Sequence, residues 1–225
     1  MSYFQKIFAI TYKDVIFEFR SRESVSSMLM FSLLVVVIFS FTFDPGSTYV
    51  FEAAPGIIWV AITFSGIIGL NRSFFYEVDK GSMHGMLLTP VDRGVIYFGK
   101  VLSNLIFMLI VEIFTLPLFM ILFNLDLYSH LAELVSVTLL ATIGFAAVGT
   151  LFSAMAVNTK TRDVMLPILL FPVFVPVILA AVNATGSILA GESWATIGDW
   201  LKLLAVFDVI FLALCYLLFE YVVEE

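Results

Sequence analysis

The sequence predicts an all-α polytopic membrane protein, and three observations lead to this fold class. Of the 225 residues, 61% are hydrophobic and 13% are charged, against about 25% charged residues in ordinary soluble domains. The mean hydropathy is +1.07. Six hydrophobic stretches are near or above the ~20 residues that cross a bilayer, and each must be a helix because lipid offers backbone groups no partner. These predicted spans are 26–43, 55–74, 95–123, 131–157, 164–182 and 201–223.

Residues 1–24 are predicted to form an amphipathic helix rather than a removable signal peptide. They carry three acidic residues, and no small-residue cleavage site follows the hydrophobic run. At about 100° per residue, one face is apolar and the opposite face is basic, as in a helix that lies along a membrane surface. An ordinary cytosolic tail is the alternative. The apolar face holds Phe4, Ile7, Phe8, Thr11, Val15 and Phe19, and the basic face holds Lys6, Lys13 and Arg20.

The distribution of basic residues predicts the orientation of the spans. Ten of the eleven Lys and Arg residues precede the first span or lie in the connections 71–100 and 158–163, and only Lys202 falls on the other side. Lys and Arg are retained in cytoplasmic segments, so both termini are predicted to be cytoplasmic, in a multi-pass protein of the cytoplasmic membrane. The outer connection 183–200 is semi-polar, which suggests a re-entrant or interfacial segment within a single domain, 1–225.

The connection 71–100 is predicted to contain a short helix that docks on a soluble partner. Ser82 is a suitable N-cap, and Pro90 ends the helix because a residue before proline avoids the helical region. An apolar methionine-rich face suits a groove on the partner, and neighbouring charges would orient it. With no nucleotide site in the chain, a separate ATPase is the natural partner. The predicted contact residues are Glu77, Asp79, Lys80, Gly81, Ser82, Met83, Met86 and Leu87.

Motifs for catalysis or for metal binding are missing from the sequence. Gly94 to Lys100 has the spacing of a phosphate-binding loop, but Val101 stands where Ser or Thr must reach Mg²⁺. We therefore interpret Lys100 as an interfacial anchor whose amine reaches back to water. His84 and His130 are predicted on opposite sides of the membrane, so they form no joint metal site. His130 is either a haem-iron ligand or, more simply, a solvated loop residue.

Neither an enzymatic activity nor nucleic-acid binding is expected of this chain. Its sequence shows no pairing of a nucleophile with a base, so catalysis is assigned to no residue. The net charge of −7 argues against nucleic acid as a partner, because a phosphate-binding surface needs clustered Lys and Arg. No metal or bound cofactor is expected in the chain itself.

Two carboxylates are predicted inside the membrane, where a charge at the bilayer centre costs at least ~2.5–3.5 kcal/mol. Glu112 lies at the middle of its span, and Asp208 lies about two turns into the last one. Glu112 is therefore expected to face the bundle interior, to be partnered, or to be protonated. Two roles stay open: an interhelical hydrogen bond to Asn104 or Thr115, or a functional ionisable group.

Span 131–157 carries small residues at four-residue intervals, which form a ridge that lets another helix approach closely. Packing within the bundle explains this ridge more simply than a substrate path does. The ridge consists of Thr142, Ala146, Thr150 and Ala154.

Several short motifs resemble the family of haem exporter protein B (CcmB), the permease of the cytochrome c maturation ABC transporter. The most specific is the run Ala-Pro-Gly-Ile-Ile-Trp-Val at 54–60, and the resemblance extends over all six spans. Departures occur at Asn71 and at 84–85, where the family is expected to have an acid and an acid–amide pair. The other motifs are Asp79-x-Gly81-Ser82, Leu87-Leu88-x-Pro90, Gly99-Lys100-Val101 and Thr161-Arg162.

The resemblance implies a fold, partners and a function. Residues 1–24 would be the elbow helix, and the helix after Ser82 the coupling helix, of an ABC-2-type exporter permease. The implied partners are an ATP- and Mg-binding ATPase (CcmA-like), a haem-handling membrane protein (CcmC-like), a small membrane subunit (CcmD-like), a haem chaperone (CcmE-like) and a second copy of the permease. ATP hydrolysis would drive haem export or the release of the haem-loaded chaperone.

Two other functions remain open at this level. An ABC-2-type permease for lipid, polysaccharide or drug shares the six spans and the coupling helix, but is expected to lack the run at 54–60. An ATPase-independent channel or scaffold would co-purify with no nucleotide-binding subunit. Loss of c-type cytochromes on deletion distinguishes the first alternative, and a detergent pull-down distinguishes the second.

Overall fold

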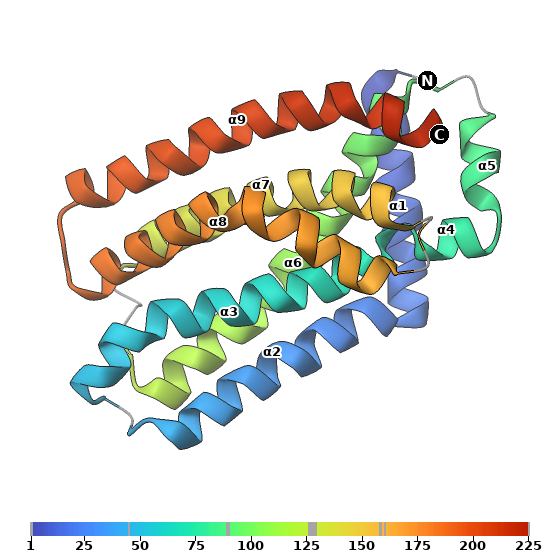
Figure 1. Cartoon of the computed structure of the whole chain (residues 1–225). Helices are drawn as coiled ribbons and strands as arrows, with labels where there is room; N and C mark the ends of the chain where they lie inside the picture. Colours follow the sequence, from blue (N-terminus) through green and yellow to red (C-terminus); the bar gives the residue numbers. More distant parts are fainter. Residues whose placement is uncertain are drawn as a thin grey trace.

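A computed structural model of the chain describes residues 2–44, 46–88, 91–125, 130–157, 159 and 161–224, without the side chains of His84, Leu87, Arg162 and Glu224. Every regular element in these ranges is an α-helix, which confirms the predicted class (Figure 1). The expected stop at Pro90 falls outside the described residues. The helices are α1 (Tyr3–Ser21), α2 (Glu23–Thr42), α3 (Thr48–Ser73), α4 (Phe75–Asp79), α5 (Ser82–Leu87), α6 (Arg93–Phe123), α7 (Leu131–Val157), α8 (Arg162–Leu189) and α9 (Trp194–Glu224).

Six of these helices, α2, α3 and α6 to α9, are long and apolar enough to cross a membrane. They correspond one to one with the predicted spans. The main difference lies at the outer connection: 183–189 continue α8, and α9 already begins at Trp194. The structure thus describes a short turn in place of a separate re-entrant element. The buried side chains of Ile188 and Ile197 extend the packing of both helices up to this turn. How deeply it enters a membrane stays a prediction.

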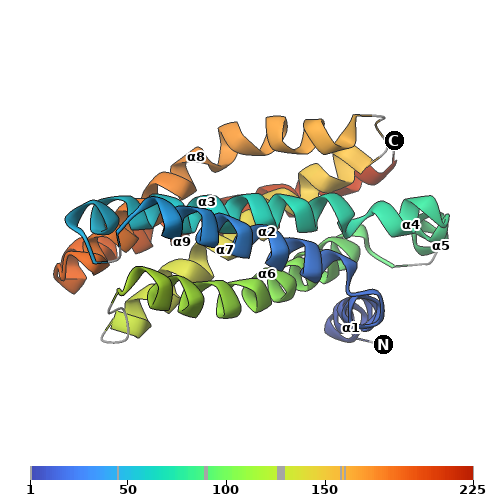
Figure 2. The same ribbon diagram turned by 90° about the horizontal axis from the view of Figure 1, so that it is seen from below.

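Helix α7 lies at the centre of the bundle and contacts α3, α6, α8 and α9 (Figure 2). Its predicted ridge of small residues is buried throughout, and its two threonines bond to α6. The amide of Asn104 donates to the hydroxyl oxygen of Thr150 at 2.9 Å, and the hydroxyl of Thr142 donates to Glu112 at 2.7 Å. The ridge therefore serves close packing of α6 on α7, as the simpler interpretation holds.

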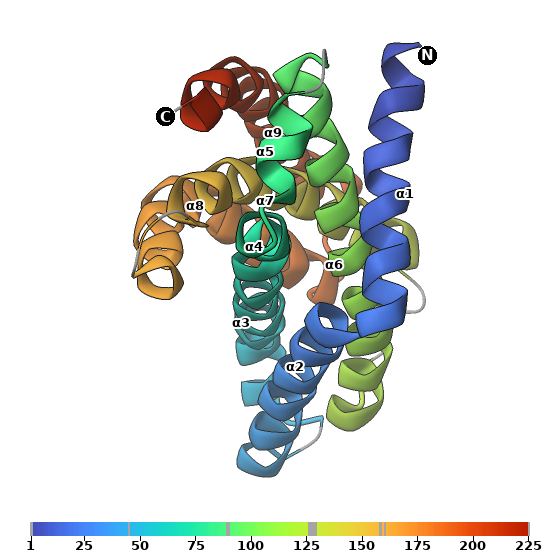
Figure 3. The same cartoon turned by 90° about the vertical axis from the view of Figure 1, so that its right-hand side faces the viewer.

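Helix α1 crosses one end of the bundle instead of running along it (Figure 3). The predicted apolar face is divided between two environments. Ile7 and Thr11 are buried against α6, and the Thr11 hydroxyl donates to the carbonyl of Gly99 at 3.1 Å. Phe8 and Phe19 are more than 60% exposed, as are Phe4 and Tyr12. An exposed row of aromatic side chains suits a helix that rests in a membrane interface.

The same end of the bundle carries α1, α4, α5 and both chain termini (Figure 1). Lys202 lies at the opposite end, in the first turns of α9. Lys202 thus lies apart from the basic residues of α1 and of the 71–100 connection, as the sequence predicts. Which end faces the cytoplasm remains a prediction, and we call the end with the termini the α1 end.

Candidate functional site

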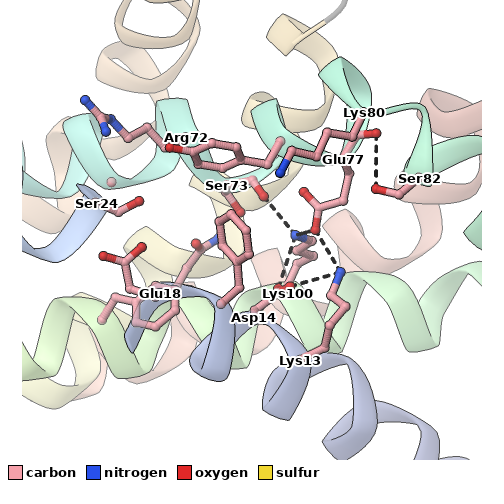
Figure 4. A pocket seen from close by; sticks show the side chains of 15 residues that line it. Lys13, Asp14, Glu18, Ser24, Arg72, Ser73, Glu77, Lys80, Ser82 and Lys100 are labelled. Atoms are coloured by element: carbon pink, nitrogen blue, oxygen red, sulfur yellow. Dashed lines mark hydrogen bonds and ion pairs between the residues drawn. The ribbon is translucent and has the colours of Figure 1, made fainter. Parts of the chain in front are cut away.

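A cluster of four charged side chains joins three helices at the α1 end. We call Lys13 and Asp14 of α1, Glu77 of α4 and Lys100 of α6 the ion cluster (Figure 4). The Lys13 ammonium lies 3.1 Å from Asp14 Oδ1 and 2.9 Å from Glu77 Oε1. The Lys100 ammonium lies 3.1 Å from Asp14 Oδ2 and also pairs with Glu77 Oε1. Each lysine thus contacts both carboxylates, and the two charges of each sign balance.

Lys100 corrects the sequence interpretation, since its amine does not reach water. Its side chain is only 2% exposed, and its third partner is the carbonyl of Ser73 at 2.8 Å. The ammonium donates hydrogen bonds to Glu77 of α4 and to the Ser73 carbonyl of α3, and it forms an ion pair with Asp14 of α1. A buried ammonium needs such partners because desolvation costs several kcal/mol. The amine is therefore an internal crosslink between α1, the end of α3, α4 and α6.

The glycines that imitate a phosphate-binding loop have a packing role instead. A Cβ on Gly99 would come within 2.8 Å of Ile10, so only glycine lets α1 lie against α6 at this point. Gly94 faces the ring of Tyr216 in α9 in the same way. Close approach of α1 is what brings Lys13 and Asp14 to Lys100. The motif therefore positions the ion cluster.

Lys13 also departs from its predicted place on the basic, solvent-facing side of α1. Its side chain is 47% exposed, and its ammonium turns inward to the ion cluster. Burial alone works against the charge, but the carboxylates of Asp14 and Glu77 outweigh it and raise the pKa of Lys13 above its usual range. Lys13 is therefore fully charged near neutral pH.

The predicted docking helix divides into an inward and an outward part. Glu77, expected to orient a partner, is buried in the ion cluster, and Met83 and Met86 pack against the core. Lys13 Nζ lies 3.9 Å from Met86 Sδ. These three residues therefore help to hold α4 and α5 on the bundle, and their predicted contact with a partner stays a prediction. The residues exposed to a partner are Asp79, Lys80, Gly81, Ser82, Gly85 and Leu88, and the side chain of Leu87 lies outside the described residues.

The turn between α4 and α5 depends on Gly81, whose φ of +68° is left-handed. Ser82 was predicted to be the N-cap, but α5 begins at Ser82 itself. Its hydroxyl donates to the carbonyl of Glu77 at 3.4 Å, so it ties α5 back to α4. The left-handed backbone at Gly81 thus sets the direction in which α5 leaves α4.

A pocket of about 320 Å³ opens beside the ion cluster, with walls from α1, α3, α4 and α6 (Figure 4). Beside the pocket, Glu23 of α2 pairs with Arg72 at 3.4 Å and accepts a hydrogen bond from the hydroxyl of Tyr76 in α4. The ammonium of Lys80 lies 5.4 Å from the ring centre of Phe17, within range of a cation–π interaction. The hydrogen bond from Tyr76 to Glu23 adds α2 to the helices that α4 touches.

The two intramembrane carboxylates both face α7, as expected for groups that avoid lipid. Glu112 is buried and accepts a hydrogen bond from Thr142 at 2.7 Å. The predicted partners are wrong, because Asn104 bonds to Thr150 and Thr115 bonds to Ser32. Asp208 is buried beside Gly144, and no hydrogen bond to its carboxylate oxygens is found among the described residues.

The run at 54–60 lies in α3 and packs against α8. The indole N–H of Trp59 donates to Thr185 of α8 at 3.0 Å, and Pro55 lies inside α3 facing Gly186. The run is thus a helix-packing motif.

His130 lies 3.5 Å from Glu133, with a third of its side chain exposed. Within the described residues no group of three potential metal ligands is found. The structure thus describes no ligand set around His130.

The sequence interpretation missed the ion cluster itself. One signal was present: Lys100 stands in an apolar stretch, where a charge is costly without a partner. Nothing in the sequence indicated that Asp14, Glu77 and Lys100 meet, because they are separated by 63 and 23 residues.

Fold and site together define a six-helix membrane protein with an amphipathic helix across one end and an ion-paired platform of short helices there. The family model described as CcmB protein matches residues 5–224, and the chain therefore belongs to the CcmB family. Heme exporter protein B of Pseudomonas aeruginosa is 26% identical over 173 residues, 77% of each chain. The protein of that name from Haemophilus influenzae is 28% identical over 162 residues, 72% of this chain and 73% of the relative.

Proposed function

We propose that the chain is the membrane permease subunit of an ABC transporter for cytochrome c biogenesis. It would couple ATP hydrolysis by a separate subunit to haem export or to release of a haem-loaded chaperone. The family match over 5–224 and relatives named Heme exporter protein B support this function. Haem is then the transported or handled ligand, and ATP and Mg²⁺ belong to the partner ATPase.

In the proposed complex, the chain spans the cytoplasmic membrane, and its α1 end faces the cytoplasm. The basic residues gathered at this end support that orientation. A CcmA-like ATPase would bind there, while CcmC-like, CcmD-like and CcmE-like proteins and a second permease copy complete the assembly.

The observation that carries the proposal is the attachment of α4 and α5 to the bundle. A docking helix transmits motion only if it moves with the helices behind it. Here Glu77, five residues before Ser82, is fixed by buried ion pairs to α1 and α6. A displacement of the exposed residues 79–82 would therefore move α4 together with α1 and α6. Asp79, Lys80, Gly81 and Ser82 are the proposed contacts with the ATPase.

The first test replaces Gly81 with Val and compares it with Gly191→Val. Both glycines have a φ of +68° and open space where a Cβ would stand, but they lie at opposite ends of the bundle. A left-handed backbone costs a non-glycine residue about 1–2 kcal/mol, so the local strain is matched. We expect the Gly81 variant alone to lose co-purification of the ATPase and stimulation of its activity.

Equal co-purification of the ATPase with both variants would contradict the proposed contact between residues 79–82 and the ATPase. Deletion of the gene is expected to abolish c-type cytochromes. Normal c-type cytochromes together with a defect in lipid, polysaccharide or drug export would instead identify an ABC-2 permease for another substrate.

A further inference from the structure

A second groove lies between α2 and α6, beside the corner where α1 meets α2. Figure 3 shows these three helices meeting at that corner. This groove has a volume of about 420 Å³, within the range of small-molecule sites. None of its lining residues belongs to the ion cluster. Its walls are Glu18, Phe19, Arg22, Val25, Ser26, Leu29, Phe107, Ile110 and Phe114.

The lining has a direction relative to the membrane. Phe107, Ile110 and Phe114 are spaced three and four residues apart, so they form one stripe along two turns of α6. Val25 and Leu29 form the facing stripe on α2. Both stripes run from the α1 end toward the middle of the spans, because α2 and α6 start at that end. The groove therefore leads from the membrane surface into the hydrocarbon layer.

A basic residue stands at the surface end of the groove. Arg22 is the corner residue between α1 and α2, with a left-handed φ of +55° that directs the chain from the surface helix into the first span. Its side chain is exposed and makes no ion pair or hydrogen bond within the part of the chain that the structure describes. Arg20 is likewise exposed and unpaired among these residues, but it does not line the groove and therefore provides a matched control. The mouth of the groove thus carries a guanidinium that forms no ion pair among the described residues.

The single carboxylate in the lining is already engaged. Glu18 Oε1 accepts a hydrogen bond from the backbone N–H of Val25 at 2.8 Å, in the first turn of α2. The positive end of the helix dipole offsets a negative charge at this position. Glu18 is therefore held at the start of α2, and it forms no ion pair with Arg22 among the described residues.

We propose that this groove binds an anionic phospholipid, with its phosphate at Arg22 and one acyl chain along the apolar stripes. An arginine at the interface above an apolar groove matches the two parts of such a lipid, and basic pockets between spans are known to hold anionic headgroups. The exposed aromatic row of α1 places this corner at headgroup level. The bound lipid would fill the angle between α1, α2 and α6.

The test compares Arg22→Gln with Arg20→Gln in the full chain, purified in mild detergent. Bound lipid is counted by native mass spectrometry after addition of phosphatidylglycerol or phosphatidylethanolamine. We expect tighter retention of phosphatidylglycerol by the wild type and by Arg20→Gln. Arg22→Gln should bind it about fivefold more weakly, equivalent to about 1 kcal/mol for one basic residue. Equal retention of the two lipids, or by the two variants, would overturn the proposal.

Two measurements on folded protein keep the test decisive. Phosphatidylglycerol with a photoreactive acyl chain should crosslink, in membranes, to peptides that contain Leu29 or Phe107, and crosslinks confined to other helices would refute the site. A cysteine at Ser26, in a chain with Cys215 replaced by Ala, reports the competing occupant. A disulfide between two such chains in membranes would show that a second copy covers the groove.

Discussion

Lysine–carboxylate ion pairs occur at both ends of the bundle. The pairs differ in how far their side chains are buried and in which helices they join. Lys202 and Asp199 lie 2.8 Å apart within one turn of α9, with both side chains 77% exposed. Lys100 is 2% exposed and joins residues of α1, α3 and α4. An exposed pair is screened by water and contributes about 0–1 kcal/mol. Of these two lysines, only Lys100 connects elements that are distant in the sequence.

The difference assigns different mechanical properties to the two ends. At the α1 end, ionic contacts hold the surface helix and the short helices to α6. At the other end, a four-residue turn joins α8 to α9, and apolar side chains such as Ile188 and Ile197 provide the packing. A protein that receives work from a partner at one end needs that end to be stiff. The comparison thus agrees with ATPase docking at the α1 end.

The largest expected effect is from Lys100→Met, compared with Lys202→Met. Loss of the Lys100 ammonium leaves two buried carboxylates with a single cation, and breaking a buried pair costs about 3–5 kcal/mol. The Lys202 variant should change stability by less than about 1 kcal/mol. Thermal unfolding in detergent measures both. Similar losses for the two lysines would show that the ion cluster does not stabilise its end of the bundle.

A smaller effect is expected from Gly99→Ala, with Gly198→Ala as the control. The new methyl group on Gly99 would meet Ile10 at 2.8 Å, whereas the one on Gly198 has open space. Overpacking costs about 1–3 kcal/mol, while the control should be neutral or slightly stabilising. Protease cleavage within α1 should therefore increase only in the Gly99 variant. Unchanged cleavage would mean that α1 tolerates a shift away from α6.

The fold could be predicted from the sequence to a large extent, because it depends on local composition. Spans of about twenty apolar residues and the placement of Lys and Arg define the six helices and their ends. The ion cluster could not be predicted, since the partners of Lys100 are set by how α1 folds back over α6. Glu112 shows the same limit. Its burial followed from its position in the span, but its partner Thr142 depends on the rotation of α7.

Glu112 provides the third test, by replacement with Gln and with Ala. Gln keeps an oxygen that can accept the proton of Thr142. Ala removes it, but that hydroxyl retains the carbonyl of Thr138 at 2.8 Å as an alternative acceptor. We therefore expect Glu112→Gln to be tolerated. Glu112→Ala should destabilise the protein by about 0.6 kcal/mol for the lost hydrogen bond, the average within membranes, and further through the loss of packed side-chain volume. A Gln variant that assembles fully yet fails to mature c-type cytochromes would show that the ionisable proton is required.

The smallest effect concerns the pH dependence of Lys13, tested with Lys13→Met. Asp14 and Glu77 raise the pKa of Lys13 in the folded chain. A raised pKa means that the stabilisation is fully present below the unfolded value of about 10.4 and is lost as the pH rises through the folded value. Between about pH 6 and pH 9 both states carry the proton, so the difference in unfolding temperature between wild type and variant should stay constant. The wild type should lose its advantage only above about pH 10, where Lys13 begins to lose its proton. A difference that shrinks already between pH 7 and pH 9 would mean that Lys13 titrates below its ordinary range, and that burial outweighs the two carboxylates.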